Sequence, residues 1–157
     1  MKKHAYFIGS VFLLLSSMGM MSLMTDNDKN KTVKVITAYL GNSDYSNGTI
    51  AKRTFDSLLK QGITARDSAG NSYKVTDFTF SYGERNLYED STGKLMVLTD
   101  YLSEFCTGDT LTTAFKHFVY VDKRTKPGDT AYLDKIRVHV PNGGNLGAKG
   151  MRFILTK

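Results

Sequence analysis

Charged side chains are densest between residues 122 and 134, where acids and bases are interspersed. The group comprises Asp122, Lys123, Arg124, Lys126, Asp129 and Asp134. Acid–base catalysis would need two of these carboxylates in one pocket, and nothing in their spacing indicates that. Two interpretations remain open: a solvated hairpin tip with cross-strand charge pairs, and a polar recognition hairpin. For the second, we predict Lys123, Arg124, Lys126 and Asp129 as partner-binding residues.

The glycine-rich segment 142–150 contains Lys149 and could be taken for a phosphate-binding loop. A Walker loop ends in Gly-Lys-Ser/Thr and opens a helix, whereas Lys149 precedes Gly150 and a predicted strand. The chain also has no Gly-x-Ser-x-Gly nucleophile motif. We therefore predict no catalytic residue and no enzymatic activity.

The sequence indicates neither a metal site nor a reactive thiol. Cys106 is the only cysteine, lies beside Phe105, and is predicted to be a buried free thiol. His117 and His139 show no ligand spacing with it. The alternating polar residues of segment 26–30 lack the glycine and distal glutamate of a calcium loop. We expect no metal and no cofactor.

Aromatic residues recur along one predicted strand, at Tyr73, Phe78, Phe80 and Tyr82. They could form a platform on which sugars stack, although aromatic residues on strands more often form core and cross-strand contacts. A glycan-binding module that uses Tyr73, Tyr82 or Tyr88 is therefore the alternative to a protein-binding one.

The composition describes a globular chain of 157 residues with nine Phe, nine Tyr and only two Pro. The net charge of +6 is scattered rather than clustered, which argues against nucleic-acid binding.

The N-terminal residues differ from the rest. Lys2, Lys3 and His4 precede the uncharged apolar segment 5–24, and the chain turns polar at 25–32. This pattern is typical of a bacterial signal peptide, and the apolar segment is also long enough for an uncleaved membrane anchor. Both interpretations place the remainder outside the cytoplasm, in the periplasm or beyond, with membrane contact only through residues 1–24. We predict a signal peptide or anchor helix at 1–24, a linker at 25–32 and a single domain at 33–157.

Short alternating segments separated by turn residues predict a mainly β domain. The predicted strands are 33–40, 63–66, 72–82, 85–89, 94–99, 115–122, 131–140 and 152–156. A phase slip near Thr76 predicts either a β-bulge or a strand whose two faces are both partly covered. Segment 101–105 could form a helical turn. Strands 115–122 and 131–140 would form a hairpin around Pro127-Gly128, a pair that fits a type II turn.

One short helix is predicted after the first strand. Phe55, Leu58 and Leu59 have i, i+3, i+4 spacing, and Gly62 fits the position just past the end. Thr49 or Thr54 could cap its start. The resulting fold class is an antiparallel two-sheet β-sandwich of about seven or eight strands with this helix inserted.

The order of several short motifs resembles the C-terminal domain of the gliding-motility protein M family of Bacteroidetes type IX secretion systems. The matching segments are 38–41, 48–52, 61–65, 73–78, 108–111 and 133–138. The resemblance implies an immunoglobulin-like periplasmic domain that works by protein contacts. We therefore expect a non-enzymatic domain of the cell envelope that contacts another envelope protein or a second copy of itself, with a glycan- or peptidoglycan-binding module as the alternative.

Overall fold

The computed structural model describes residues 35–141 and 143–157, so the predicted leader and linker lie outside the described residues. The elements, in chain order, are β1 (Ile36–Leu40), β2 (Gly48–Ala51), α1 (Lys52–Lys60), β3 (Ile63–Asp67), β4 (Ser72–Glu89), β5 (Leu95–Thr107), α2 (Thr113–Lys116), the π-helical turn η1 (His117–Val121), β6 (Thr130–His139), β7 (Asn145–Gly147) and β8 (Met151–Thr156).

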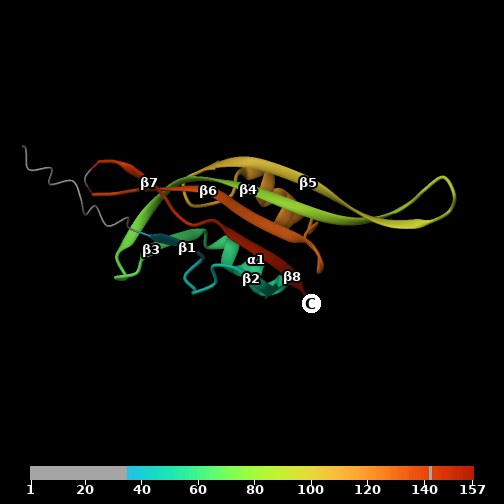
Figure 1. Cartoon of the computed structure of the whole chain (residues 1–157), viewed down its shortest axis with the longest axis horizontal. Coiled ribbons are helices and arrows are strands. Elements are labelled where there is room, and N and C mark those ends of the chain that lie inside the picture. Colours follow the sequence, from blue (N-terminus) through green and yellow to red (C-terminus); the bar gives the residue numbers. More distant parts are fainter. Residues whose placement is uncertain (1–34, 142) are drawn as a thin grey trace, which may run out of the picture. The chain divides into compact units, whose positions relative to one another are not determined.

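The strands form one curled sheet, which confirms the prediction of a mainly β domain (Figure 1). Its order is β1-β3-β4-β6-β8-β2, with β5 paired to β4 and β7 paired to β6. All neighbours run antiparallel except β2 and β8, which are parallel, so the sheet is mixed rather than purely antiparallel as predicted. Parallel neighbours need a long connection, and here almost the whole domain separates the two strands. The two-sheet immunoglobulin-like packing is not confirmed.

The predicted helix is confirmed as α1, which buries Phe55 and Leu59. Gly62 has a φ of +91°, the left-handed conformation that glycine adopts most easily after a helix end. The predicted caps are wrong. The helix begins after Ala51, which provides no side-chain cap, because β2 continues directly into the first turn.

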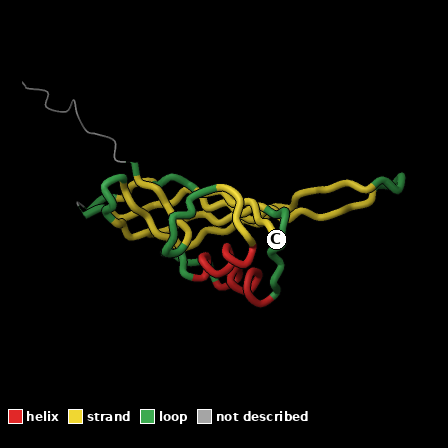
Figure 2. Tube along the Cα trace, turned by 90° about the horizontal axis from the view of Figure 1, so that it is seen from below, coloured by secondary structure: helices red, strands yellow, loops and turns green. Residues whose placement is uncertain are grey.

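Residues 115–122 were predicted to be a strand, and this prediction is wrong. They lie in α2 and η1, where the Thr112 hydroxyl accepts a hydrogen bond from the backbone N–H of Phe115 at 3.3 Å. Phe115 and Phe118 pack their rings edge-on against Phe80 and Tyr82, at centroid distances of 4.8 and 5.4 Å. Figure 2 shows the helices gathered on one side of the strands.

The predicted turn at Pro127-Gly128 is confirmed, although it does not join two strands. Gly128 has a φ of +95°, and the N–H of Asp129 donates to the carbonyl of Lys126 at 3.3 Å. The turn instead connects the loop after η1 to β6. The predicted hairpin therefore does not exist.

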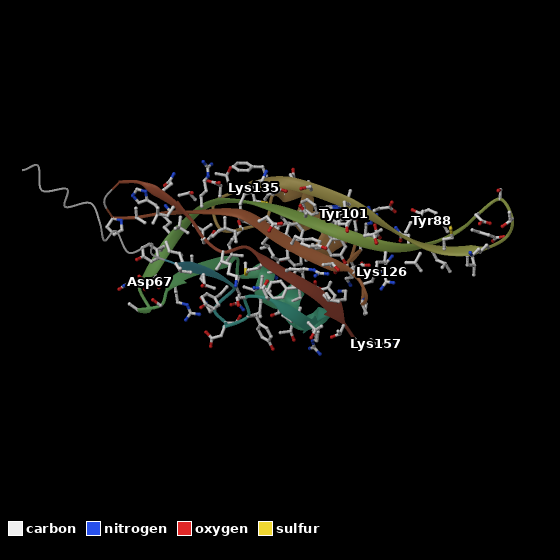
Figure 3. All side chains as sticks on the ribbon, viewed as in Figure 1. Asp67, Tyr88, Tyr101, Lys126, Lys135 and Lys157 are labelled. Atoms are coloured by element: carbon white, nitrogen blue, oxygen red, sulfur yellow. The ribbon has the colours of Figure 1, made fainter. Side chains whose placement is uncertain are left out.

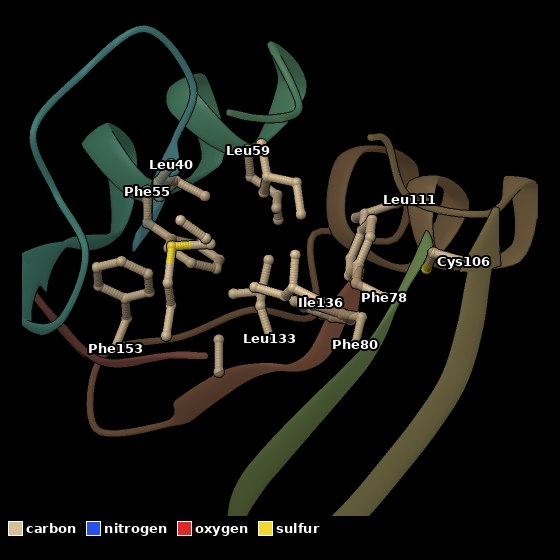
Figure 4. Close-up of a cluster of buried hydrophobic side chains, with 14 of the residues drawn as sticks. Leu40, Phe55, Leu59, Phe78, Phe80, Cys106, Leu111, Leu133, Ile136 and Phe153 are labelled. Atoms are coloured by element: carbon tan, nitrogen blue, oxygen red, sulfur yellow. The ribbon is translucent and has the colours of Figure 1, made fainter. Parts of the chain in front are cut away.

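The hydrophobic core lies between the curled sheet and the helices (Figure 4). Its fully buried members include Leu40, Phe55, Phe78, Leu133 and Phe153. Cys106 is also buried, as predicted.

The predicted β-bulge is confirmed, because the β4–β6 register shifts on both sides of Asp77. The helical turn predicted at 101–105 is wrong, because these residues continue β5.

In the part of the chain that the structure describes, no helix has the length and apolarity needed to cross a membrane.

Candidate interaction site

Strands β4 and β5 continue together beyond the rest of the sheet. They pair without a register break from Asp77 opposite Thr107 to Glu89 opposite Leu95. The pairing of β4 with β6 ends earlier, at Gly83 opposite Thr130. Residues 84–100, which we call the arm, therefore form a two-stranded ribbon that extends past the other strands (Figure 1). Isolated two-stranded ribbons are marginally stable in water.

One face of β5 is uncharged, mostly apolar and open to solvent. Side chains alternate between faces along a strand, so the odd-numbered residues from 95 to 107 share a face. In order they are Leu95, Val97, Thr99, Tyr101, Ser103, Phe105 and Thr107. Among them, Leu95, Val97, Tyr101 and Phe105 are between 53% and 65% exposed. β5 pairs only with β4, so its outer edge also presents unpaired backbone groups.

The position of Tyr101 on this face is set by a glycine. Gly83 stands opposite Tyr101, and a Cβ on Gly83 would lie 3.0 Å from the Tyr101 ring. The ring passes over the glycine toward Tyr132, with a centroid distance of 6.4 Å. Figure 3 shows Tyr101 and Tyr88 on the β4–β5 pair and Lys126 beside it.

The even-numbered face of the arm carries a polar network. The carboxylate of Asp100 accepts hydrogen bonds from the Tyr88 hydroxyl at 2.6 Å and the Asn86 amide at 2.9 Å. These bonds, Tyr88 first, lower the pKa of Asp100, and the same carboxylate raises the pKa of Tyr88. Lys126 Nζ donates to the Asn86 amide oxygen at 2.8 Å, which ties the arm to the loop after η1.

The predicted partner-binding residues lie where the arm leaves the sheet. Asp129 is fully buried, and its carboxylate accepts hydrogen bonds from the Tyr82 hydroxyl at 2.6 Å, the Arg85 N–H at 2.8 Å and the Lys126 N–H at 3.3 Å. Burial, then the bond to Asp129, raises the pKa of Tyr82. Asp129 therefore fixes the base of the arm from inside the protein.

Two of the predicted partner-binding residues, Arg124 and Lys126, neutralise the Glu84 carboxylate at the base of the arm. Glu84 is only 8% exposed, and its side chain accepts from Arg124 Nη2 at 2.6 Å and lies 3.6 Å from Lys126 Nζ. The Arg124 guanidinium also stacks over the Phe118 ring at 4.8 Å. Lys123 is exposed and has a φ of +52°, at the point where the chain turns out of η1.

The structure thus brings Arg124, Lys126 and Asp129 together around the base of the arm. The other acids of the cluster lie apart, because Asp122 contacts His117 at 3.2 Å and Asp134 is exposed on β6. Whether the predicted set contacts a partner stays a prediction.

The predicted sugar-stacking platform is wrong for three of its four residues, because they are buried. Phe78, Phe80 and Tyr82 have no exposed surface and cannot stack on a ligand. Tyr73 donates to Asp67 at 2.8 Å and is half-buried, whereas Tyr88 is 41% exposed on the arm.

Sequence reasoning missed the exposed face of β5. The signal was present, because no glycine or proline interrupts residues 95–107. The short apolar segment 101–105 was interpreted as a helical turn instead, which separated it from the strand predicted at 94–99.

Within residues 35–141 and 143–157, no group of three or more His, Cys, Asp or Glu side chains is arranged to hold a metal ion. No family model matches the chain, and no curated protein matches it.

Proposed function

We propose that this chain is an exported, non-enzymatic domain that contacts another protein of the cell envelope through the arm and the adjoining outer edge of β5. The observation that carries the proposal is the long, exposed and uncharged face of β5, which is mostly apolar. Soluble proteins usually protect such edges with charged residues, prolines or bulges. β5 contains neither lysine nor proline, and its pairing with β4 is continuous. Its two charged residues, Asp100 and Glu104, belong to the even-numbered face.

The hydrogen bonds at the base support a binding role for the arm. Asp129, Arg124 and Lys126 hold β4 where β6 pairing stops. A ribbon fixed at its base presents a defined strand edge, and strand addition to such an edge is a common way to bind an extended segment.

The cellular setting is part of the proposal and rests on the sequence. The leader-like segment 1–24 supports export to the periplasm, with a cleaved signal peptide or an inner-membrane anchor. The resemblance to the gliding-motility protein M family supports an immunoglobulin-like domain related to the type IX secretion and gliding machinery.

The test compares two substitutions in the full chain, expressed in the bacterium that produces it. Val97→Glu puts a charge on the arm, and Leu146→Glu puts the same charge at an exposed apolar position on β7. Native electrophoresis of gently solubilised envelopes then reports the size of the complex that contains the protein. We expect Val97→Glu to shift the protein to a smaller species and Leu146→Glu to leave it unchanged. An unchanged complex for Val97→Glu, in a protein that unfolds at the wild-type temperature, would overturn the proposal.

A further inference from the structure

We infer that the strand added to the outer edge of β5 is β5 of a second copy, antiparallel, with Tyr101 opposite Tyr101. This inference rests on the proposed function, because it names the protein that the arm contacts. In this arrangement, β4 and β5 of each copy form one four-stranded sheet. A sheet of three or more strands with an apolar face has the independent stability that a two-stranded ribbon lacks.

The register follows from the length and composition of β5. The strand runs from Leu95 to Thr107, so Tyr101 is its midpoint and full overlap places that residue opposite itself. Val97 then faces Phe105, and Thr99 faces Ser103, which joins the exposed apolar faces of both copies into one surface. β-Branched residues opposite aromatic ones are favourable cross-strand pairs.

The two carboxylates of β5 favour this register over its neighbours. With the twofold axis at Tyr101, Asp100 lies opposite Leu102 and Glu104 lies opposite Leu98 of the second copy. Moving the axis to Asp100 would set that carboxylate opposite itself, and moving it to Leu102 would set Asp100 opposite Glu104. Like charges directly opposite one another destabilise a strand pair.

The same carboxylates leave the edge unprotected. Asp100 is occupied by Tyr88 and Asn86 of its own arm, and Glu104 accepts a hydrogen bond from the Thr112 hydroxyl. Both point to the even-numbered face, and in the inferred register each lies opposite a leucine rather than a like charge.

A groove on that face fits a side chain of the second copy. It has a volume of ≈ 390 Å³, lies between β5 and the α2–η1 segment, and is lined by Leu102, Phe115, Phe118 and Arg124 among others. The inferred register sets Leu98 of the second copy opposite Glu104, at this groove. Leu98 is 46% exposed in the single chain and would contact the apolar part of the groove lining, which Leu102, Phe115 and Phe118 provide.

Cysteine cross-linking of the purified full chain tests the register. Opposed residues in antiparallel strands have Cα atoms about 4.5–5.5 Å apart, within the range that a disulfide joins. Tyr101→Cys should form a disulfide-linked dimer under mild oxidation, with twice the mass of the single chain. Thr99→Cys and Ser103→Cys should each stay monomeric alone and form a mixed dimer when combined. Leu146→Cys, and the unsubstituted chain with its buried Cys106, are the controls.

Each outcome decides the inference. Cross-linking of Tyr101→Cys no faster than Leu146→Cys, or equal cross-linking of Thr99→Cys alone, would overturn it. If the chain stays a monomer in light scattering while the envelope complex still depends on Val97, the partner is a different protein and only this inference fails. If the envelope complex is also indifferent to Val97, the proposed function fails with it.

Discussion

The carboxylate of Asp129 accepts the backbone N–H of Arg85 at 2.8 Å, just beyond the last residue pair that joins β4 to β6. Within a sheet, a backbone carbonyl of the neighbouring strand would accept this N–H. Here the Asp129 side chain accepts it instead. The arm is therefore anchored to the body by a buried carboxylate rather than by sheet pairing.

Removing that carboxylate should destabilise the whole domain. Asp129→Ala leaves the buried Tyr82 hydroxyl and the Arg85 N–H without their acceptor, which we expect to cost about 3 kcal/mol in the free energy of unfolding. Urea unfolding measures the loss. Asp134→Ala, at an exposed position on β6, is the control and should change stability by less than about 0.5 kcal/mol. Equal effects for the two variants would contradict the anchoring role.

Filling the space beneath Tyr101 should also be costly. Gly83→Val would place side-chain atoms against the Tyr101 ring and Thr99, which already lie 3.0 and 3.1 Å from a Cβ at this position. We expect a loss of about 1–3 kcal/mol from overpacking. Gly147→Val is the control, because a Cβ there meets nothing within 4 Å.

A double substitution separates the ring contact from other causes. In a Tyr101→Ala background, Gly83→Val should cost clearly less, which thermal or urea unfolding of the four proteins measures as a coupling free energy. Additive effects would show that the Tyr101 ring does not occupy the space over Gly83.

Arg124 and Lys126 should be redundant in neutralising Glu84. Each cation is about half exposed, so Arg124→Ala or Lys126→Ala alone should cost about 1 kcal/mol or less. Together they leave the nearly buried Glu84 carboxylate unpaired, and we expect about 3 kcal/mol. Adding Glu84→Gln to the double variant should restore most of the loss in urea unfolding. If Glu84→Gln restores no stability, the two cations do not stabilise the protein by neutralising Glu84.

Asp77 should make stability depend on pH in acid. The Arg137 guanidinium, which donates to its carboxylate at 2.6 Å, lowers the pKa of Asp77 against the opposing effect of burial, with help from the Thr76 hydroxyl. A folded-state pKa below the unfolded value of ~3.9 stabilises the protein above that pH, and the stabilisation disappears as pH falls through the folded pKa.

The measurement compares unfolding free energies of the unsubstituted chain and Asp77→Asn between pH 7 and pH 2. We expect the unsubstituted chain to be more stable at pH 7 and the difference to shrink below about pH 4. A difference that stays constant through the acid range would contradict the assignment.

Where local patterns have one interpretation, the sequence predicts the structure well. The spacing of Phe55 and Leu59 with Gly62 indicates α1, the phase slip near Thr76 indicates the β-bulge, and Pro127-Gly128 indicates the turn. The helix end and the turn depend on contacts within a few residues, whereas the bulge is defined by the pairing of β4 with β6.

Segment 115–122 shows why other elements were missed. Its Phe, Val and Tyr residues favour a strand, but Phe115, Phe118 and Val119 also have the i, i+3, i+4 spacing of a helix face. Packing against Phe80 and Tyr82, more than thirty residues earlier in the chain, decides between the two. The burial of Asp129 likewise depends on Tyr82 and Arg85, so a charged loop residue could not be recognised as an internal anchor from the sequence.

Photo-cross-linking in the producing bacterium tests the role of the arm most directly. A photo-reactive residue at Val97 is compared with one at Leu146, which is similarly exposed on β7. We expect a discrete protein adduct from Val97 that is absent from Leu146, with twice the mass of the chain if the partner is a second copy. A correctly folded protein that gives no adduct from Val97, or the same adducts from both positions, would show that the arm is not the contact surface.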